Sequence, residues 1–152
     1  MAADAWVVHD DFKLYLGNGA IDLDGDTFKM ILCQSTSNVA TTSVGTYTAV
    51  TNEVANGNGY TTGGETMTTL AYAAGSPVTT MYWDADNVVW TASGGSITAR
   101  YAAIYDDTVA TSPGADTLVC HSLLDNSPAD VTATDGNTFT VAINASGIFS
   151  LA

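Results

Sequence analysis

The chain has 152 residues, of which 46% are apolar and only 12% are charged. Sixteen acids against three bases give it a formal net charge of −13. Such a surface repels phosphate backbones and anionic lipid heads, which argues against nucleic acids and membrane surfaces as partners. The length suits one domain with its own core, and we expect residues 1–152 to form a single domain.

The polar residues are mainly Thr, Ser, Asn and Gly rather than charged residues. Because Thr is β-branched and Ser and Asn compete with the helical backbone, this mixture favours strands and turns. No run of about 18 apolar residues occurs, so we expect no membrane span. Residues 1–8 contain an acid and no basic region, which predicts that there is no signal peptide and that synthesis occurs without Sec export.

The two cysteines, Cys33 and Cys120, are too few for a disulfide framework. Both lie in apolar, strand-like runs, so we predict buried free thiols. A disulfide between them is the alternative.

The N-terminal lead is apolar and contains Trp6, Val7 and Val8. It fits either a first strand or an arm of residues 1–11 that reaches across a neighbouring molecule. The next stretch, residues 12–16, carries apolar side chains at helical spacing, although a strand fits nearly as well.

A short helix at this position would have recognisable ends. Asp10 or Asp11 can cap its N-terminus, because a carboxylate accepts hydrogen bonds from the first backbone N–H groups. Gly17 is the expected residue just past its C-terminus, where a positive φ is common.

The centre of the predicted core is the stretch from Tyr82 to Asp107. Residues 88–92 and 97–105 alternate between apolar and polar positions, and the sequence Ser-Gly-Gly-Ser separates them at 93–96. This pattern predicts two strands joined in a hairpin. One face of the second strand is expected to carry Ile97, Ala99, Tyr101, Ala103 and Tyr105.

Turn residues and short apolar runs continue along the chain, giving roughly nine strands in the pattern of an all-β sandwich or jelly roll. Both faces of the strand at 28–34 are apolar, which predicts that it is covered on both sides. The other predicted strands are residues 21–23, 46–50, 66–72, 78–83, 117–124, 138–144 and 147–151. The side chains expected inside the sandwich include Phe28, Leu32, Trp90, Tyr101, Ala103 and Ile148.

Three aspartates two residues apart, Asp22, Asp24 and Asp26, are the best candidates for a calcium site. An EF-hand would need Gly at 27 and an acid at 33, where this chain has Thr27 and Cys33. A polar turn between two strands explains the acids, and we predict no metal site.

The remaining candidates for chemistry also have simpler explanations. The zinc-type ligands are His9, His121 and the two cysteines, whose spacing matches no finger or knuckle. The acid pairs Asp84/Asp86 and Asp106/Asp107 fall at the ends of the central stretch, where acids are ordinary turn residues. No catalytic motif is present, so we predict a protein that is not an enzyme and has no cofactor.

The single arginine, Arg100, lies within a predicted strand of a chain rich in acids. We expect it to form a structural salt bridge, with Asp106 or Asp84 as its partner. A role in binding another molecule is the alternative.

Several motifs resemble those of small virion proteins of tailed bacteriophages, and they follow one another over nearly the whole chain. They are LGNGAIDL at 16–23, DTFKM at 26–30, NEV at 52–54, GYTTGG at 59–64, DADNVVWTA at 84–92, ARYAAIYDD at 99–107 and NASGIF at 144–149.

This resemblance implies a non-enzymatic structural protein that is made in the host cytoplasm and built into the virion. Cement or decoration proteins of the outer capsid surface fit this description, with the major capsid protein as partner. A tail or fibre component that binds a host receptor or a glycan is the alternative.

Virion proteins sit on symmetry axes, so we expect a homotrimer, or failing that a dimer. The expected capsid contacts lie in the N-terminal lead, because its apolar side chains stand out in an acidic protein. They are Trp6, Val7, Val8 and Phe12.

Overall fold

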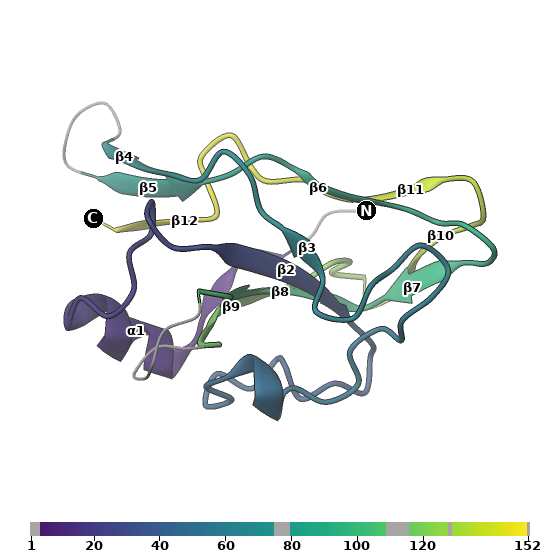
Figure 1. Cartoon of the computed structure of the whole chain (residues 1–152), viewed down its shortest axis with the longest axis horizontal. Helices are drawn as coiled ribbons and strands as arrows, with labels where there is room; N and C mark the ends of the chain where they lie inside the picture. The colour runs from purple at the N-terminus through teal and green to yellow at the C-terminus, as the bar shows by residue number, and fades with distance from the viewer. Residues whose placement is uncertain (1–3, 75–79, 109–115, 128, 152) are drawn as a thin grey trace.

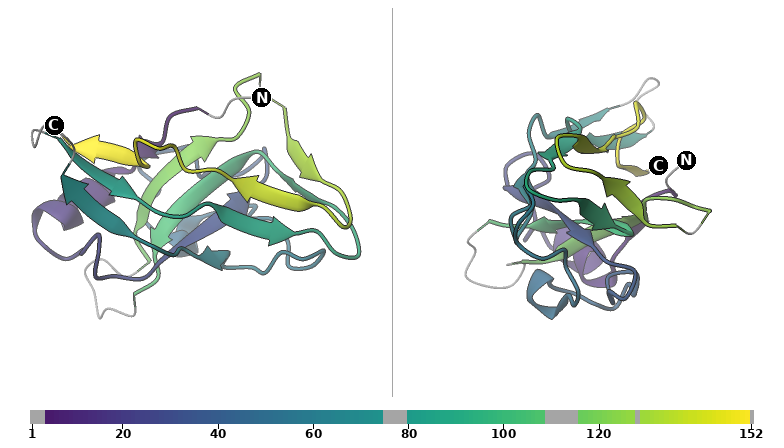
Figure 2. Two further views of the ribbon diagram at one scale, coloured as in Figure 1. Left: turned by 90° about the horizontal axis from the view of Figure 1, so that it is seen from above. Right: turned by 90° about the vertical axis from the view of Figure 1, so that its right-hand side faces the viewer.

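The chain folds into two β-layers that face each other across a hydrophobic core (Figures 1 and 2). A computed structural model describes residues 4–74, 80–108, 116–127 and 129–151. The first layer is a five-stranded antiparallel sheet in the order β1-β9-β8-β2-β3. Its strands are β1 (Val7–Val8), β2 (Phe28–Cys33), β3 (Glu65–Thr66), β8 (Tyr101–Asp106) and β9 (Leu118–Leu123).

The second layer contains two groups of strands, β12-β5-β4 and β11-β6. A further pair, β10-β7, continues the line of β9 and β8 at one end of the first layer. All of these pairs are antiparallel, and they confirm the all-β sandwich. The strands are β4 (Ala71–Ala74), β5 (Met81–Asp84), β6 (Val88–Thr91), β7 (Ile97–Ala99), β10 (Val131–Ala133), β11 (Thr138–Val141) and β12 (Phe149–Leu151).

The predicted central hairpin is wrong in its pairing, although both strands exist. β6 pairs with β11, and β7 pairs with β10. The turn at 93–96 carries the chain from one layer to the other, with Gly94 at φ 80° and its N–H donating to Asp135 Oδ1. Alternation identifies a strand and its buried face, but it does not identify the neighbouring strand.

A break at Arg100 divides the second strand of that predicted hairpin into β7 and β8. The Arg100 N–H donates to Cys33 O, and its carbonyl accepts from the Leu124 N–H. The break reverses the alternation: Ile97 and Ala99 lie in the core between the layers, whereas Ala103 and Tyr105, predicted on the same face, lie on the opposite side of the sheet. Tyr101, predicted to lie inside, is only half-buried.

β2 is covered on both faces, as predicted. Phe28, Met30 and Leu32 point into the core between the layers. Ile31 and Cys33 point the other way, into a second cluster beneath the segment 34–50. This segment contains a 3-10 turn, η1 (Tyr47–Ala49), so the strand predicted at 46–50 is wrong.

The predicted helix exists as α1 (Asp10–Gly17), but its ends differ from the prediction. His9 is the N-cap residue and makes no side-chain cap, so neither Asp10 nor Asp11 has that role. Gly17 lies inside the helix, and Gly19 takes the positive φ of 75°. Among the residues that the structure describes, no helix has the length and apolar character to cross a membrane.

Other boundaries also differ from the sequence prediction. Residues 21–23 form no strand. The strand predicted at 66–72 is interrupted at Thr69, whose φ of 55° turns the chain from β3 toward β4 in the other layer. β10 was missed. Residues 75–79, and with them part of the strand predicted at 78–83, lie outside the described residues.

Cys33 and Cys120 are free and fully buried, which confirms the prediction for both thiols. They lie on opposite faces of the first sheet, Cys33 in the outer cluster and Cys120 between the layers. Burial raises the pKa of the Cys33 thiol to about 12 and that of Cys120 well above its usual value. Both cysteines therefore act as small apolar core residues.

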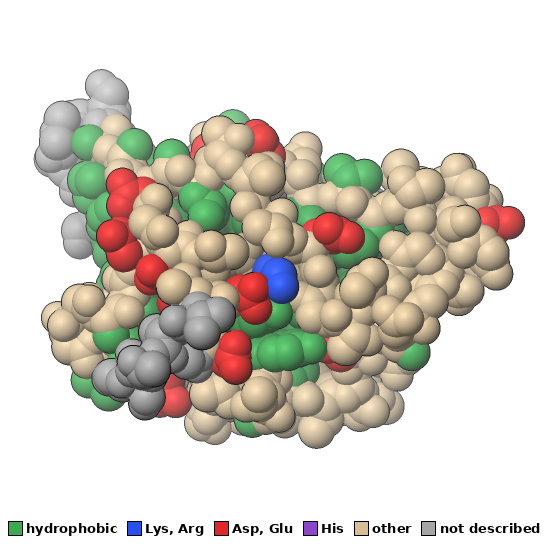
Figure 3. Space-filling model, in the orientation of Figure 1, with side chains coloured by type: hydrophobic (Ala, Val, Ile, Leu, Met, Phe, Trp, Pro, Cys, Tyr) green, Lys and Arg blue, Asp and Glu red, His purple; other side chains and the backbone are tan. Residues whose placement is uncertain are grey.

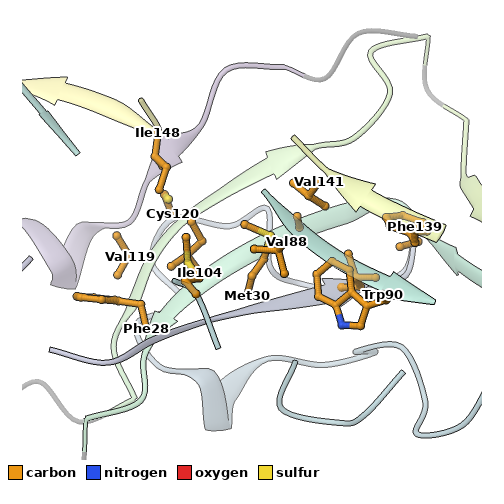
Figure 4. Packing of buried hydrophobic residues seen from close by; sticks show 14 of the residues in the cluster. Phe28, Met30, Val88, Trp90, Ile104, Val119, Cys120, Phe139, Val141 and Ile148 are labelled. Carbon is orange, nitrogen blue, oxygen red and sulfur yellow. The ribbon is translucent and has the colours of Figure 1, made fainter. Parts of the chain in front are cut away.

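The core between the layers joins side chains from both sheets, as Figure 4 shows. Phe28, Met30 and Ile104 come from the first layer, and Trp90 and Phe139 come from the second. The rings of Trp90 and Phe139 meet edge to face with their centroids 6.3 Å apart. Trp90 is only 2% exposed, and its indole N–H has no acceptor among the described residues.

We predict that Trp90→Ala lowers the free energy of unfolding by roughly 3–5 kcal/mol, because it leaves a large cavity between the layers. Trp90→Phe is the matched control: it keeps an aromatic ring and removes no hydrogen bond, so it should cost much less. Urea denaturation followed by circular dichroism measures both. Equal losses for the two variants would contradict the cavity argument.

Candidate partner-binding groove

A groove of about 910 Å³ opens along one side of the sandwich, between the edges of the two layers. One wall is the segment from Asp4 to Trp6 together with the end of β9 and part of β10. The other wall is β11 and the chain that leads from it into β12. The side chains that line the groove and remain partly accessible are Trp6, Leu124, Val131, Ile143 and Phe149.

Both walls are edge strands. Within the described part of the chain, β1 pairs only with β9, and β11 pairs only with β6. The N–H of Asp4 donates to Leu123 O at 2.9 Å, so the lead already follows β9 before β1 begins. An edge strand presents backbone N–H and C=O groups that another strand can pair with.

The walls of the groove carry little charge for a strongly acidic chain, because Asp4 is the one charged residue in the lining. Residues 137–152 contain no charged residue, and neither do residues 5–8. Figure 3 shows the acidic side chains on one face of the molecule, where they far outnumber the basic ones. The groove is therefore a mostly uncharged site in a strongly acidic protein.

The three basic side chains are all paired with acids. Lys13 binds Asp10 at 3.0 Å, Lys29 binds Asp107 at 2.8 Å, and Arg100 binds Asp130 at 2.7 Å. The prediction that Arg100 forms a salt bridge is confirmed, but the predicted partners, Asp106 and Asp84, are wrong. Arg100 directly follows β7, and Asp130 directly precedes β10, so the pairing of these two strands brings the two side chains together.

The residues predicted to contact a capsid are in four different environments. Trp6 is half-buried and lines the groove, and Val7 is 45% exposed on β1. Val8 is partly buried against the core. Phe12 is 1% exposed and packs edge to face on Phe149, so it is a core residue and unavailable for contact with a partner.

The N-terminal lead is a strand along the sheet, not an arm. Residues 4–8 follow β9, with Val7 opposite His121 and Val8 opposite Cys120. Residue 10 already begins α1. Of the two interpretations that the sequence left open, the structure shows a first strand at Val7–Val8, and residues 10–11 belong to α1.

Two histidines that are far apart in the sequence, His9 and His121, are in contact where the N-terminal strand pairs with β9. His9 Nε2 lies 3.0 Å from His121 Nδ1, and His9 Nδ1 lies 2.8 Å from Val44 O. Because a carbonyl can only accept, His9 Nδ1 carries a proton, and in the neutral pair His121 Nδ1–H donates to His9 Nε2. The pair thus joins the N-terminal strand to β9 and to the segment 34–50.

Burial keeps both histidines neutral. Desolvation lowers the pKa of His121 to about 4, with a further contribution from His9. Desolvation also lowers the pKa of His9, although the hydrogen bond to Val44 and the nearby Asp10 oppose this effect and Lys13 reinforces it. A proton taken up here would be a charge inside the protein with little compensation.

The aspartate candidates behave as turn residues. Asp26 Oδ2 accepts from the Asp22 N–H at 2.6 Å, and Asp22 Oδ1 accepts from the Asp24 N–H at 3.4 Å. Asp106 Oδ1 accepts from the Thr108 N–H, and burial raises the pKa of Asp106. In the described residues, no group of three or more His, Cys, Asp or Glu is placed to hold a metal ion.

The sequence analysis missed a partly buried polar network centred on Glu53. Its carboxylate accepts hydrogen bonds from the hydroxyls of Tyr47 and Tyr60 and from the Gly63 N–H. Tyr105 stacks on Tyr47 with centroids 4.4 Å apart. The only signal in the sequence is a lone acid in a Gly-rich stretch flanked by tyrosines, which has no periodicity to recognise.

Comparison with known protein families, with curated proteins and with solved structures gives no match. The likeness to phage virion proteins therefore depends on the sequence motifs alone.

We predict that EDTA leaves the melting temperature unchanged, since two of the three carboxylates in the Asp22–Asp26 turn, those of Asp22 and Asp26, already accept hydrogen bonds from backbone N–H groups. A ligand bound only to the native state would raise the melting temperature, and its removal would lower it. Differential scanning calorimetry with and without EDTA measures this. A drop of several degrees that calcium reverses, and that Asp24→Asn abolishes, would establish a metal site in this turn.

We predict that the protein loses stability as the pH falls from 6.5 toward 4. In this window the unfolded chain binds a proton at His121 that the folded protein does not, because the pKa of His121 is about 4 in the folded protein and about 6.5 in the unfolded chain. Between pH 7 and pH 5 the loss from His121 is about 2 kcal/mol.

The matched variant is His121→Gln, which can still donate to His9 but does not titrate. Urea denaturation at pH 7 and pH 5 should show a smaller loss for this variant than for the wild type. An identical pH dependence in both proteins would show that His121 does not control it.

Proposed function

We propose that the protein is a structural subunit of a phage particle that binds the outer surface of the head as a cement or decoration protein. The observation that carries the binding role is the groove, because two uncharged edge strands flank accessible apolar side chains on a protein of net charge −13. The phage assignment is supported by the sequence motifs, which resemble those of virion proteins along nearly the whole chain.

The major capsid protein is the proposed partner, and Trp6 and Val7 are the proposed contact residues. Trp6 supplies a large, partly accessible aromatic side chain, the residue type that most often dominates an interface. Val7 follows Trp6 at the start of β1 and is 45% exposed on the same edge of the sheet, outside the lining of the groove. Val8 and Phe12 support this edge from the core side instead of contacting the partner.

The mechanism requires only modest affinity per contact. Many subunits on one head, each joined to others in a trimer or a dimer, bind with an avidity that exceeds any single contact. The shell is stabilised because subunits bound across capsid proteins must dissociate before those proteins can separate.

A tail or fibre role is the second candidate, with the same groove facing a receptor or a glycan. Sugar binding would need aromatic faces open to solvent. Trp83 and Trp90 are 0% and 2% exposed, so they are not such a platform. Trp6 is the partly exposed tryptophan of the groove.

The test uses heads assembled without this protein, to which the purified protein is added. We expect hundreds of copies over the head surface by electron microscopy, and heads that withstand a higher temperature before releasing DNA. Trp6→Asp and Val7→Asp should lower the occupancy roughly tenfold or more, since each places a charge in the apolar contact.

Val89→Asp is the matched control, because Val89 is similarly exposed, at 48%, but lies on β6, which is not part of the N-terminal edge formed by Trp6 and Val7. Its occupancy should equal that of the wild type. Circular dichroism must show that all three variants are folded. A few copies at the tail tip, or wild-type occupancy by Trp6→Asp, would contradict the proposal.

A further inference from the structure

We infer that the groove is a strand-addition site: β11 pairs along its free edge with an extended, uncharged segment of a partner protein that is flanked by lysine or arginine. This inference deepens the proposed function and uses the same groove, but it concerns the mode of binding and the chemistry of the bound segment.

The backbone of β11 is oriented for this pairing. At one end of β11 the carbonyl of Asn137 accepts from the Ala92 N–H, and at the other end the N–H of Ile143 donates to Asn87 Oδ1. The odd-numbered residues thus direct their backbone groups toward β6. Since a strand alternates, Thr138, Thr140 and Ala142 direct theirs away from β6, along the open side of the sandwich.

The side chains of β11 leave this edge accessible. Thr138 and Thr140 are exposed, whereas Phe139 and Val141 are buried in the core. Edge strands that must avoid pairing usually carry charges, proline or a bulge. β11 and the following residues up to 144 contain no charge and no proline, although exposed positions were available for both.

The groove beside β11 accommodates the side chains of an added strand. Alternate residues of such a strand point into the space between the layers, where Trp6, Ile143 and Phe149 form the lining. The others point to solvent next to the threonines. The best match is therefore a strand of alternating β-branched apolar and small polar residues.

Electrostatics selects a cationic partner over a second copy of this chain. Each copy carries a net charge of −13 and its three bases are already paired with acids, so a second copy is disfavoured at this edge, and the proposed trimer or dimer would form through another surface. Asp4, on the wall of the groove, is exposed and forms no ion pair within the described residues. Basic residues at the ends of the partner's segment would be attracted by this field.

The test is titration of the purified protein with a synthetic peptide of alternating threonine and valine that has a lysine at each end. Trp6 is half-buried, whereas the other two tryptophans are buried, so a bound strand should shift the tryptophan emission to the blue. Amide hydrogen exchange should slow at Thr140 and Ala142. Ile143→Asp should weaken binding at least tenfold, and Val89→Asp should not.

Two altered peptides test the chemistry of the bound segment. N-methylation of the central valines removes the backbone donors and should abolish binding. Glutamates in place of the terminal lysines should weaken binding at least tenfold at low salt, and high salt should reduce this difference.

Four outcomes would overturn the inference. The first is no binding at peptide concentrations up to about 1 mM. The second and third are binding of the N-methylated peptide or of the glutamate peptide as tight as that of the lysine peptide. The fourth is a dimer in light scattering that Thr140→Pro dissociates, which would assign the edge to a second copy. None of these decides the proposed function: a protein that decorates heads but fails the peptide test binds them in another way. If the protein binds the peptide but not the heads, the strand-addition site is supported and the proposed role in a phage head is rejected.

Discussion

The carboxylate of Glu53 holds the long segment between β2 and β3 against the first sheet. Its Oε1 accepts from the Tyr60 hydroxyl and the Gly63 N–H, each at 2.7 Å, and its Oε2 accepts from the Tyr47 hydroxyl at 2.8 Å. Hydrogen bonds to an ionised acceptor are among the stronger ones in proteins. Burial and the carboxylate itself raise the pKa of both phenols, so both remain protonated donors. These hydrogen bonds to Glu53 thereby connect the first half of the segment, through Tyr47, with its second half, through Tyr60 and Gly63.

This tie closes one side of the sandwich and leaves the other open. The Tyr60 hydroxyl also accepts from the Leu32 N–H, and the Val54 N–H donates to Leu32 O, so the outer edge of β2 is paired beyond the short β3. Gly64 packs so closely on Met30 O that a side chain there would clash. On the opposite side, β1 and β11 are edge strands without such a cover, and the groove lies between them. The position of the candidate site is thus a consequence of where the long segment is fixed.

The sequence predicted local structure well and spatial arrangement poorly. The alternation that marks β6 is local, and so is the apolar character of both faces of β2, and these predictions are confirmed. The pairing of β6 with β11 depends on which layer each strand joins, and local alternation does not contain that information. In the same way, a break of a single residue, Arg100, was enough to place Ala103 and Tyr105 on the face opposite to the predicted one. For the site, Trp6 and Val7 stand out as apolar residues in an acidic chain. The opposite wall is far away in sequence, and only the fold brings Ile143 beside Trp6.

The distribution of charge explains how the edge of β11 can lack local protection against pairing with a second copy. Local protection would require a charge or a proline on β11, and either would also prevent a partner from pairing there. A net charge of −13 on the rest of the chain opposes the pairing of two copies along this edge without altering the edge itself. Repulsion between copies falls with ionic strength, whereas hydrogen bonds and apolar contacts within a filled groove are much less sensitive to salt. In the proposed strand site, the acidic surface therefore discriminates between partners by charge at long range, and the uncharged edge binds by backbone pairing at short range. A subunit that must stay dispersed until it meets its assembly needs this combination.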